Sequence, residues 1–279
     1  MCRRSSGDGL EERRDRHGVP YWLHLPEGVE LSSLRPNRTG IKIAEPRVLH
    51  VVYGTVLQQL PLSKSHLDDW IRRGVSSETV KRHHVRSWPP GGKERARLAN
   101  RLYLEFGDQM RGVPGWFIRD GKPMLAGGSG WTIPMFDLAS GCICAFRIRS
   151  DSDKGTKYYW LSSSKRGGVS PGIHARLAWP GRAPRRGDRS HVVRVTEGEA
   201  KSVVLAERTG IPTLSVPGVA MWTLALPWLR WLKTRRVLLC FDTDRYQKKE
   251  VAAAYLAAAR GLHSHGLTVR TETWGARSA

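Results

Sequence analysis

The sequence has few cysteines and no pair of them spaced for a zinc ribbon. The four are Cys2, Cys142, Cys144 and Cys240, and none stands in a C-x2-C pair, which a zinc ribbon needs. Cys142 and Cys144 are two residues apart in a strand-like stretch, so we expect them to share one face and to pack there. So few cysteines are typical of a reducing compartment, and we predict a cytoplasmic protein.

Long hydrophobic runs are also missing. The longest apolar tract, residues 216–232, is interrupted by Pro217, Gly218, Pro227 and Arg230, and it is short for a membrane span. The N-terminus is polar and charged, without the apolar core of a signal peptide. We therefore expect no membrane contact.

Acidic residues are outnumbered almost two to one. Lys and Arg total 46 against 25 Asp and Glu, which gives a net charge of +21 and a pI of about 10.6 in 279 residues. A chain of this length has room for two domains. An excess of positive charge favours a nucleic-acid partner, because bound phosphates release their counterions. The alternative is a solvated basic surface in a protein from a genome that uses arginine freely.

The first half of the sequence is predicted to hold a basic arm and then helices. Residues 1–47 are rich in Arg, Gly, Pro and Ser, so we expect a poorly ordered arm with one short strand near Gly40–Ala44. Helical spacing of apolar residues predicts helices over 48–60, 64–73 and 93–110, and a short one that Ser76 or Ser77 caps. The Gly-Gly-Lys at 91–93 lacks the other residues of a P-loop.

From Val113 the apolar period changes to two, which predicts a β-meander. The expected strands are 116–119, 124–126, 131–136, 142–149 and 158–161. Basic residues dominate from Arg147 to Arg189, with Tyr158, Tyr159 and Trp160 among them, a mixture that suits single-stranded nucleic acid. The alternative is a basic meander with aromatic residues in its core, where we expect Trp160. The candidate nucleic-acid contacts in this stretch are Arg147, Arg149, Lys157, Lys165 and Arg166.

The last segment alternates strands with helices. Strands are predicted at 192–196, 211–216, 236–241 and 267–274, and helices at 199–208, 220–232 and 247–262. This order is typical of a mostly parallel sheet with right-handed crossovers. The fold class is therefore α/β, with a four-stranded, Rossmann-like sheet at the C-terminus.

Carboxylates follow two of these strands. Glu197 ends the first strand, and Asp242 and Asp244 end the third. Ligands of parallel sheets collect where strands end, and Mg²⁺ or Mn²⁺ takes oxygen ligands. We therefore predict a divalent-metal site. Lys201, one turn into the following helix, is positioned to reach a phosphate or to remain solvated.

These motifs resemble the Toprim domain. It carries Glu-Gly after its first strand and Asp-x-Asp after its third, and bacterial-type primases, topoisomerases, some nucleases and recombination mediators share it. Upstream, Ile133–Asp137, Lys157-Tyr158 and Leu161–Ser163 resemble the segment that precedes Toprim in bacterial primases. Thr196–Lys201 and Pro217–Val219 resemble a family of Toprim proteins of phages, plasmids and integrative elements. The resemblance covers about residues 60–274.

The resemblance implies three parts and a reaction. Residues 1–47 would be the arm, 48–189 a helical hairpin plus basic meander like the first part of a primase core, and 190–279 a Toprim domain. Glu197, Asp242 and Asp244 would be catalytic and would bind Mg²⁺ or Mn²⁺. The reaction would be nucleotidyl transfer, joining nucleotides on single-stranded DNA during replication.

The sequence also departs from these relatives. It has neither a zinc ribbon nor a helicase motif, so a separate helicase is a candidate partner. No acidic motif follows Trp274, which predicts a C-terminally truncated Toprim domain or an incomplete metal site. Two other functions stay open: a non-catalytic, DNA-binding replication accessory protein with a degenerate Toprim site, and a Toprim nuclease.

Overall fold

The computed structural model describes residues 11–14, 20–23, 40–152, 154–182, 184–185, 187–242 and 249–272. The chain divides into two units, residues 1–38 and 39–279. In the first unit β1 (Glu11–Arg14) pairs with β2 (Pro20–Leu23) as an antiparallel hairpin, which the sequence did not predict. The strand predicted near Gly40–Ala44 is absent, and those residues form a loop.

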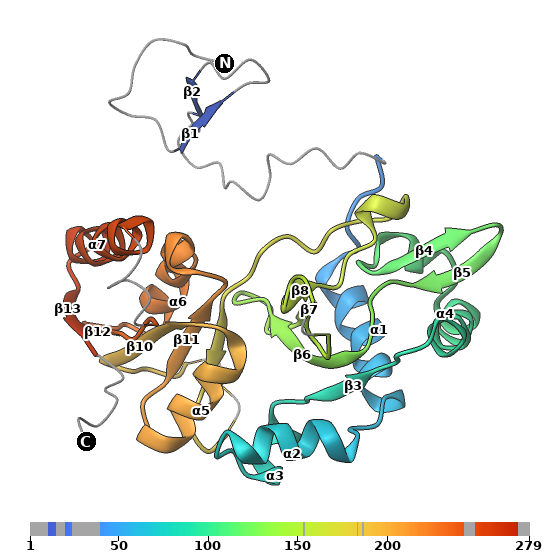
Figure 1. The fold of residues 1–279 in the computed structure, drawn as a ribbon, viewed down its shortest axis with the longest axis horizontal. Coiled ribbons are helices and arrows are strands. Elements are labelled where there is room, and N and C mark those ends of the chain that lie inside the picture. Colours follow the sequence, from blue (N-terminus) through green and yellow to red (C-terminus); the bar gives the residue numbers. More distant parts are fainter. Residues whose placement is uncertain are drawn as a thin grey trace. The chain divides into compact units, whose positions relative to one another are not determined.

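Four helices open the second unit (Figure 1): α1 (Pro46–Gln59), α2 (Lys64–Arg72), α3 (Ser77–Arg82) and α4 (Gly92–Phe106). The Ser63 and Ser76 side chains accept hydrogen bonds from backbone N–H groups in the first turns of α2 and α3, which confirms the predicted caps. α4 is shorter than predicted. Gly107 ends it with φ of 53°, and a 3₁₀ helix, η2 (Gly107–Gly112), follows.

A four-stranded antiparallel sheet, the meander sheet, comes next. Its strand order is β3-β6-β7-β8. The bounds are β3 (Arg86–Trp88), β6 (Gly130–Phe136), β7 (Ile143–Ser150) and β8 (Tyr158–Trp160), and a separate hairpin joins β4 (Trp116–Arg119) to β5 (Lys122–Leu125). β3 was not predicted. One core holds α1, α4 and this sheet together, and within it the rings of Tyr53 and Phe146 lie 4.4 Å apart.

The C-terminal sheet has five strands, in the order β13-β12-β10-β11-β9. The four predicted strands are parallel: β10 (Val192–Glu197), β11 (Thr213–Val216), β12 (Arg236–Leu239) and β13 (Thr268–Thr271). The fifth, β9 (Arg176–Ala178), follows η3 (Ser164–Arg166) and pairs antiparallel with β11. β9 was missed because a three-residue strand that contains a buried arginine has no apolar pattern.

Helices cover both faces of this sheet (Figure 1). α5 (Glu199–Thr209) packs on one face, and α6 (Leu226–Trp231) and α7 (Lys249–Ser264) pack on the other. The helix predicted over 220–232 is instead η4 (Val219–Ala225) followed by α6. Pro227 explains the division, because proline fits the first turn of a helix and disrupts the interior.

A third core joins the helices and the meander sheet to the C-terminal sheet. Trp70 and Trp131 lie against each other with ring centroids 4.9 Å apart, in one cluster with Val203 and Ala206 of α5. The Arg82 guanidinium pairs with Glu207 at 3.1 Å across the same junction. α5 begins two residues after Glu197. It is therefore held by the part of the molecule that α1–α4, the β4–β5 hairpin and the meander sheet form, which we call the meander half. The boundary at residue 190 stays a prediction, and β9, which precedes it, belongs to the C-terminal sheet.

Candidate active site

Glu197 is the last residue of β10, the middle strand of the C-terminal sheet. Gly198 follows with φ of 81°, a conformation that favours glycine, and α5 begins at Glu199. The chain therefore turns sharply from strand to helix at Glu197. Since β10, β11 and β12 are parallel, their carboxyl ends share one edge of the sheet.

Asp242 reaches that edge from β12. The Cys240 N–H donates to the Val195 carbonyl at 2.8 Å, and the Thr196 hydroxyl donates to the Cys240 carbonyl at 2.6 Å. These bonds extend the pairing of the two strands up to the site. As a result, the side chains of Glu197 and Asp242 are hydrogen-bonded to each other. We call these two residues the acidic pair. The convergence of Glu197 and Asp242 is as predicted, whereas Asp244 lies outside the described residues.

The two carboxylates of the acidic pair differ in their affinity for a proton. Burial, together with the hydrogen bond to Asp242 and its negative charge, raises the pKa of Glu197 to about 7. Burial also acts to raise the pKa of Asp242, but hydrogen bonds from Glu197 and Lys201 outweigh it and that pKa is lowered. Near neutral pH, Glu197 is thus the member of the pair that gains and loses a proton.

Lys201, in the first turn of α5, donates a hydrogen bond to the Asp242 carboxylate and so forms a salt bridge with it. From the sequence, Lys201 could either contact a phosphate or remain solvated. In the structure its hydrogen-bonding partner is Asp242 of the acidic pair.

The acidic pair fits a divalent cation. It offers carboxylate oxygens alone, which Mg²⁺ and Mn²⁺ prefer, and Mg²⁺ commonly keeps several waters beside one or two carboxylates. Burial is the main cause of the raised pKa of Glu197, and the hydrogen bond and negative charge of Asp242 add to it; a bound cation would offset that negative charge. Among the described residues no group of three His, Cys, Asp or Glu side chains could hold a metal ion. Glu272, the last acidic residue of the chain, pairs with Arg194 at 3.0 Å.

The raised pKa of Glu197 predicts that the protein in chelator-containing buffer becomes less stable as the pH rises from about 5 to about 8. In the unfolded chain the pKa of a glutamate is about 4.3. Between that value and about 7, the folded protein therefore holds a proton that the unfolded chain has released. This contribution of Glu197 to the free energy of unfolding is fully present below its pKa in the unfolded chain. It is lost as the pH rises through its pKa in the folded protein. The measurement is the melting temperature of wild type and Glu197→Gln across this range. If the melting temperatures of wild type and Glu197→Gln change with pH in parallel, the raised pKa does not belong to Glu197.

The other predicted contacts lie on the meander half. Lys157, Lys165 and Arg166 are exposed, and the guanidinium of Arg166 lies 5.1 Å from the ring centre of Phe117 in β4. Arg147 and Arg149 are less accessible, since 12% and 19% of their side chains are exposed. Arg149 lies 3.8 Å from Asp69.

Arg147 belongs to a buried charge cluster that the sequence did not predict. Its Nε lies 3.5 Å from Glu199, an ion pair without a hydrogen bond from that nitrogen, and its guanidinium lies 4.6 Å above Trp160. Trp160 is thus half-buried rather than a core residue. Arg176 of β9, only 2% exposed, donates to His83 Nδ1 at 2.7 Å and to the Pro134 carbonyl at 3.2 Å.

Burial dominates the electrostatics of this cluster. It lowers the pKa of Arg176 to about 10, although Glu199 counteracts the shift, and it raises the pKa of Glu199 despite Arg147. We call Glu199, Arg147, Arg176 and His83 the buried charge cluster. It ties α3, the meander sheet and β9 to the first turn of α5, two residues beyond Glu197. In the sequence, the only indication of this cluster is Glu199, the acidic residue that follows Gly198.

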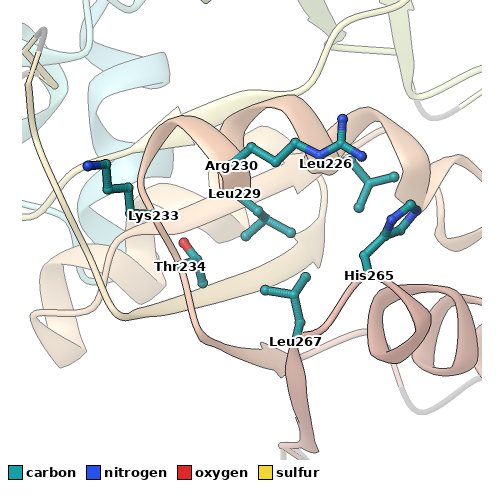
Figure 2. Close-up of a pocket in the computed structure, with 7 residues that line it drawn as sticks. All are labelled: Leu226, Leu229, Arg230, Lys233, Thr234, His265 and Leu267. Atoms are coloured by element: carbon teal, nitrogen blue, oxygen red, sulfur yellow. The ribbon is translucent and has the colours of Figure 1, made fainter.

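A small pocket of about 110 Å³ lies at the opposite edge of the C-terminal sheet (Figure 2). Thr234 and Leu267 precede β12 and β13, so the pocket is at the amino ends of those strands, away from the acidic pair. Three leucines, a threonine and three basic side chains line it: Leu226, Leu229, Leu267, Thr234, Arg230, Lys233 and His265.

In the described part of the chain, no helix has the length and hydropathy needed to cross a membrane.

No protein-family model and no curated protein matches this sequence. Several solved structures match its fold. A DnaG primase catalytic domain bound to single-stranded DNA is 17% identical with a TM-score of 0.58, and the match covers 83% of this chain and 72% of that chain. The Aquifex aeolicus primase, with zinc-binding and RNA polymerase domains, is 15% identical with a TM-score of 0.60, and 84% of this chain matches 56% of it. The Escherichia coli primase catalytic core is 19% identical with a TM-score of 0.57, over 84% and 73%. This chain therefore has the fold of a bacterial primase catalytic core.

Proposed function

We propose that this chain is a primase-like Toprim protein of a phage, plasmid or integrative element, which joins nucleotides on single-stranded DNA in a metal-dependent reaction. The observation that carries the proposal is the position of the acidic pair. Glu197 and Asp242 are hydrogen-bonded at the carboxyl edge of a parallel sheet, and that sheet belongs to a fold shared with primase cores.

Each part of the site has a task in this reaction. A bound Mg²⁺ or Mn²⁺ would supply charge neutralisation and orientation of the nucleotide phosphates. Glu197 and Asp242 would hold it, and a carboxylate oxygen of Glu197 that does not contact the metal would accept the proton of the attacking hydroxyl. The exposed Lys157, Lys165 and Arg166 would hold the phosphates of the DNA.

A second function is a DNA-binding replication accessory protein without catalysis. The salt bridge between Lys201 and Asp242 favours it, because it already neutralises one carboxylate of the pair. In this case too a separate helicase is a candidate partner, since it would supply single-stranded DNA.

One assay separates these functions. The protein is incubated with a single-stranded template, labelled nucleotides and Mg²⁺ or Mn²⁺, and the products are resolved by size. Template-dependent oligonucleotides support primer synthesis. Shortening of the template indicates a Toprim nuclease, and retention of an unchanged template indicates a binding protein.

The basic meander predicts a change in the salt dependence of DNA binding. Each phosphate of single-stranded DNA that the protein no longer neutralises should reduce the slope of log affinity against log salt by about 0.7. Replacing Lys157 and Lys165 by alanine should therefore reduce the slope, because both are exposed and lie in the basic, aromatic-containing stretch from Arg147 to Arg189. The matched control replaces Lys81 and Lys122, which are exposed on α3 and β5. The measurement is fluorescence anisotropy at several salt concentrations. Equal slopes in wild type and the double variant would remove these lysines from the interface.

A further inference from the structure

Lys201 is a cation bound to the acidic pair. It is the third residue of α5, and its ammonium donates to Oδ1 of Asp242. Side chains in the first turn of a helix point back toward its N-terminus, which here begins beside the acidic pair. The side chains of Lys201 and Asp242 are 27% and 49% exposed, so ions from solvent can reach this contact.

Both partners of Asp242 affect its capacity to bind a metal. Glu197 forms a hydrogen bond with its carboxylate, and Lys201 binds Oδ1. An ammonium and a divalent cation seek the same carboxylate oxygens, and they repel each other at short range. A metal held by Glu197 and Asp242 would therefore have to displace Lys201 or bind against its charge.

We propose that Lys201 is a resident cation of the acidic pair, which competes with divalent metal for Asp242 and so weakens metal binding by the wild-type protein. This inference rests on the proposed function, because it takes the acidic pair to be a metal site. Its consequence is that removing the positive charge at position 201 strengthens metal binding, although it removes a group from the site.

The test is direct binding of Mn²⁺ alone to the full chain, with free Mn²⁺ measured by electron paramagnetic resonance. Lys201→Met should bind Mn²⁺ about tenfold more tightly than wild type, a change typical of coupled sites. Lys201→Arg keeps the charge and should bind as weakly as wild type. Lys122→Met removes an exposed lysine from β5 and controls for the change in net charge.

Glu197→Gln distinguishes the two proposals. If Glu197→Gln abolishes Mn²⁺ binding while Lys201→Met binds as wild type does, the role of Lys201 is overturned and the metal site stands. If neither wild type nor Lys201→Met binds Mn²⁺, both proposals are overturned. If Lys201→Met alone binds Mn²⁺, Lys201 blocks the site in the wild-type protein, which supports the inference. Melting curves establish that each variant folds, and Lys201→Gln is measured as a second neutral variant.

Discussion

Replacing Glu197 by glutamine is expected to lower the rate of primer synthesis about a hundredfold or more, which corresponds to about 2.7 kcal/mol of transition-state stabilisation. Glutamine keeps the shape of the side chain, but it cannot accept the proton of an attacking hydroxyl and it removes one negative charge from the acidic pair. The defect should appear in the rate and not in folding, because Glu197 is a half-buried residue at the end of β10 and glutamine fills the same space. The measurement is the initial rate of primer formation with Mg²⁺ or Mn²⁺.

The matched control for this change is Glu250→Gln. Glu250 is an exposed glutamate in the first turn of α7. Its replacement should leave the rate within experimental error of wild type. Metal-dependent primer synthesis by Glu197→Gln at the wild-type rate would contradict the assigned role of Glu197.

Replacing Glu199 by alanine is expected to lower the free energy of unfolding by about 3–5 kcal/mol, since it leaves buried cations without their counter-charge. Glu199 and Arg176 are each only 2% exposed, and the Arg147 guanidinium lies beside Glu199. Arg176 Nη1 already makes no hydrogen bond, so the cluster has no spare acceptor to compensate. The measurement is urea unfolding followed by circular dichroism.

Two variants test whether charge is the cause. Glu199→Gln keeps an acceptor for the arginines and should lose less stability than Glu199→Ala. Glu250→Ala removes an exposed carboxylate and should change stability by at most about 0.5 kcal/mol. Unfolding of Glu199→Ala at the same urea concentration as wild type would show that the buried charge cluster does not stabilise the fold.

The alternation of strands and helices was enough to predict the carboxyl edge of the C-terminal sheet. A strand that ends in Glu197 and a parallel strand that ends near Asp242 must bring these carboxylates together if the strands are neighbours, and β10 and β12 are neighbours. The caps at Ser63 and Ser76 were predictable for a similar reason, because capping depends on residues close in sequence.

The partners of the charged residues were not predictable. Arg147, Arg176 and Glu199 come from β7, β9 and α5, and their contacts depend on how the meander half packs against α5. In the sequence Arg147 is one of many basic residues of the meander, whereas in the structure it is largely buried beside Glu199. Long-range charge pairs of this kind leave no local pattern. Residues 219–231 divide into η4 and α6 because Pro227 fits the first turn of a helix and not its interior, an effect that the apolar pattern of the sequence does not show.

The central claim, that the acidic pair is the metal site of a nucleotidyl-transfer enzyme, is tested most directly by crystals grown with Mn²⁺ and a nucleoside triphosphate. The measurement is the anomalous scattering of manganese. We predict a peak in contact with the carboxylates of Glu197 and Asp242 and with the triphosphate. Bound nucleotide with no anomalous peak at these two carboxylates, or with manganese only elsewhere, would contradict the claim.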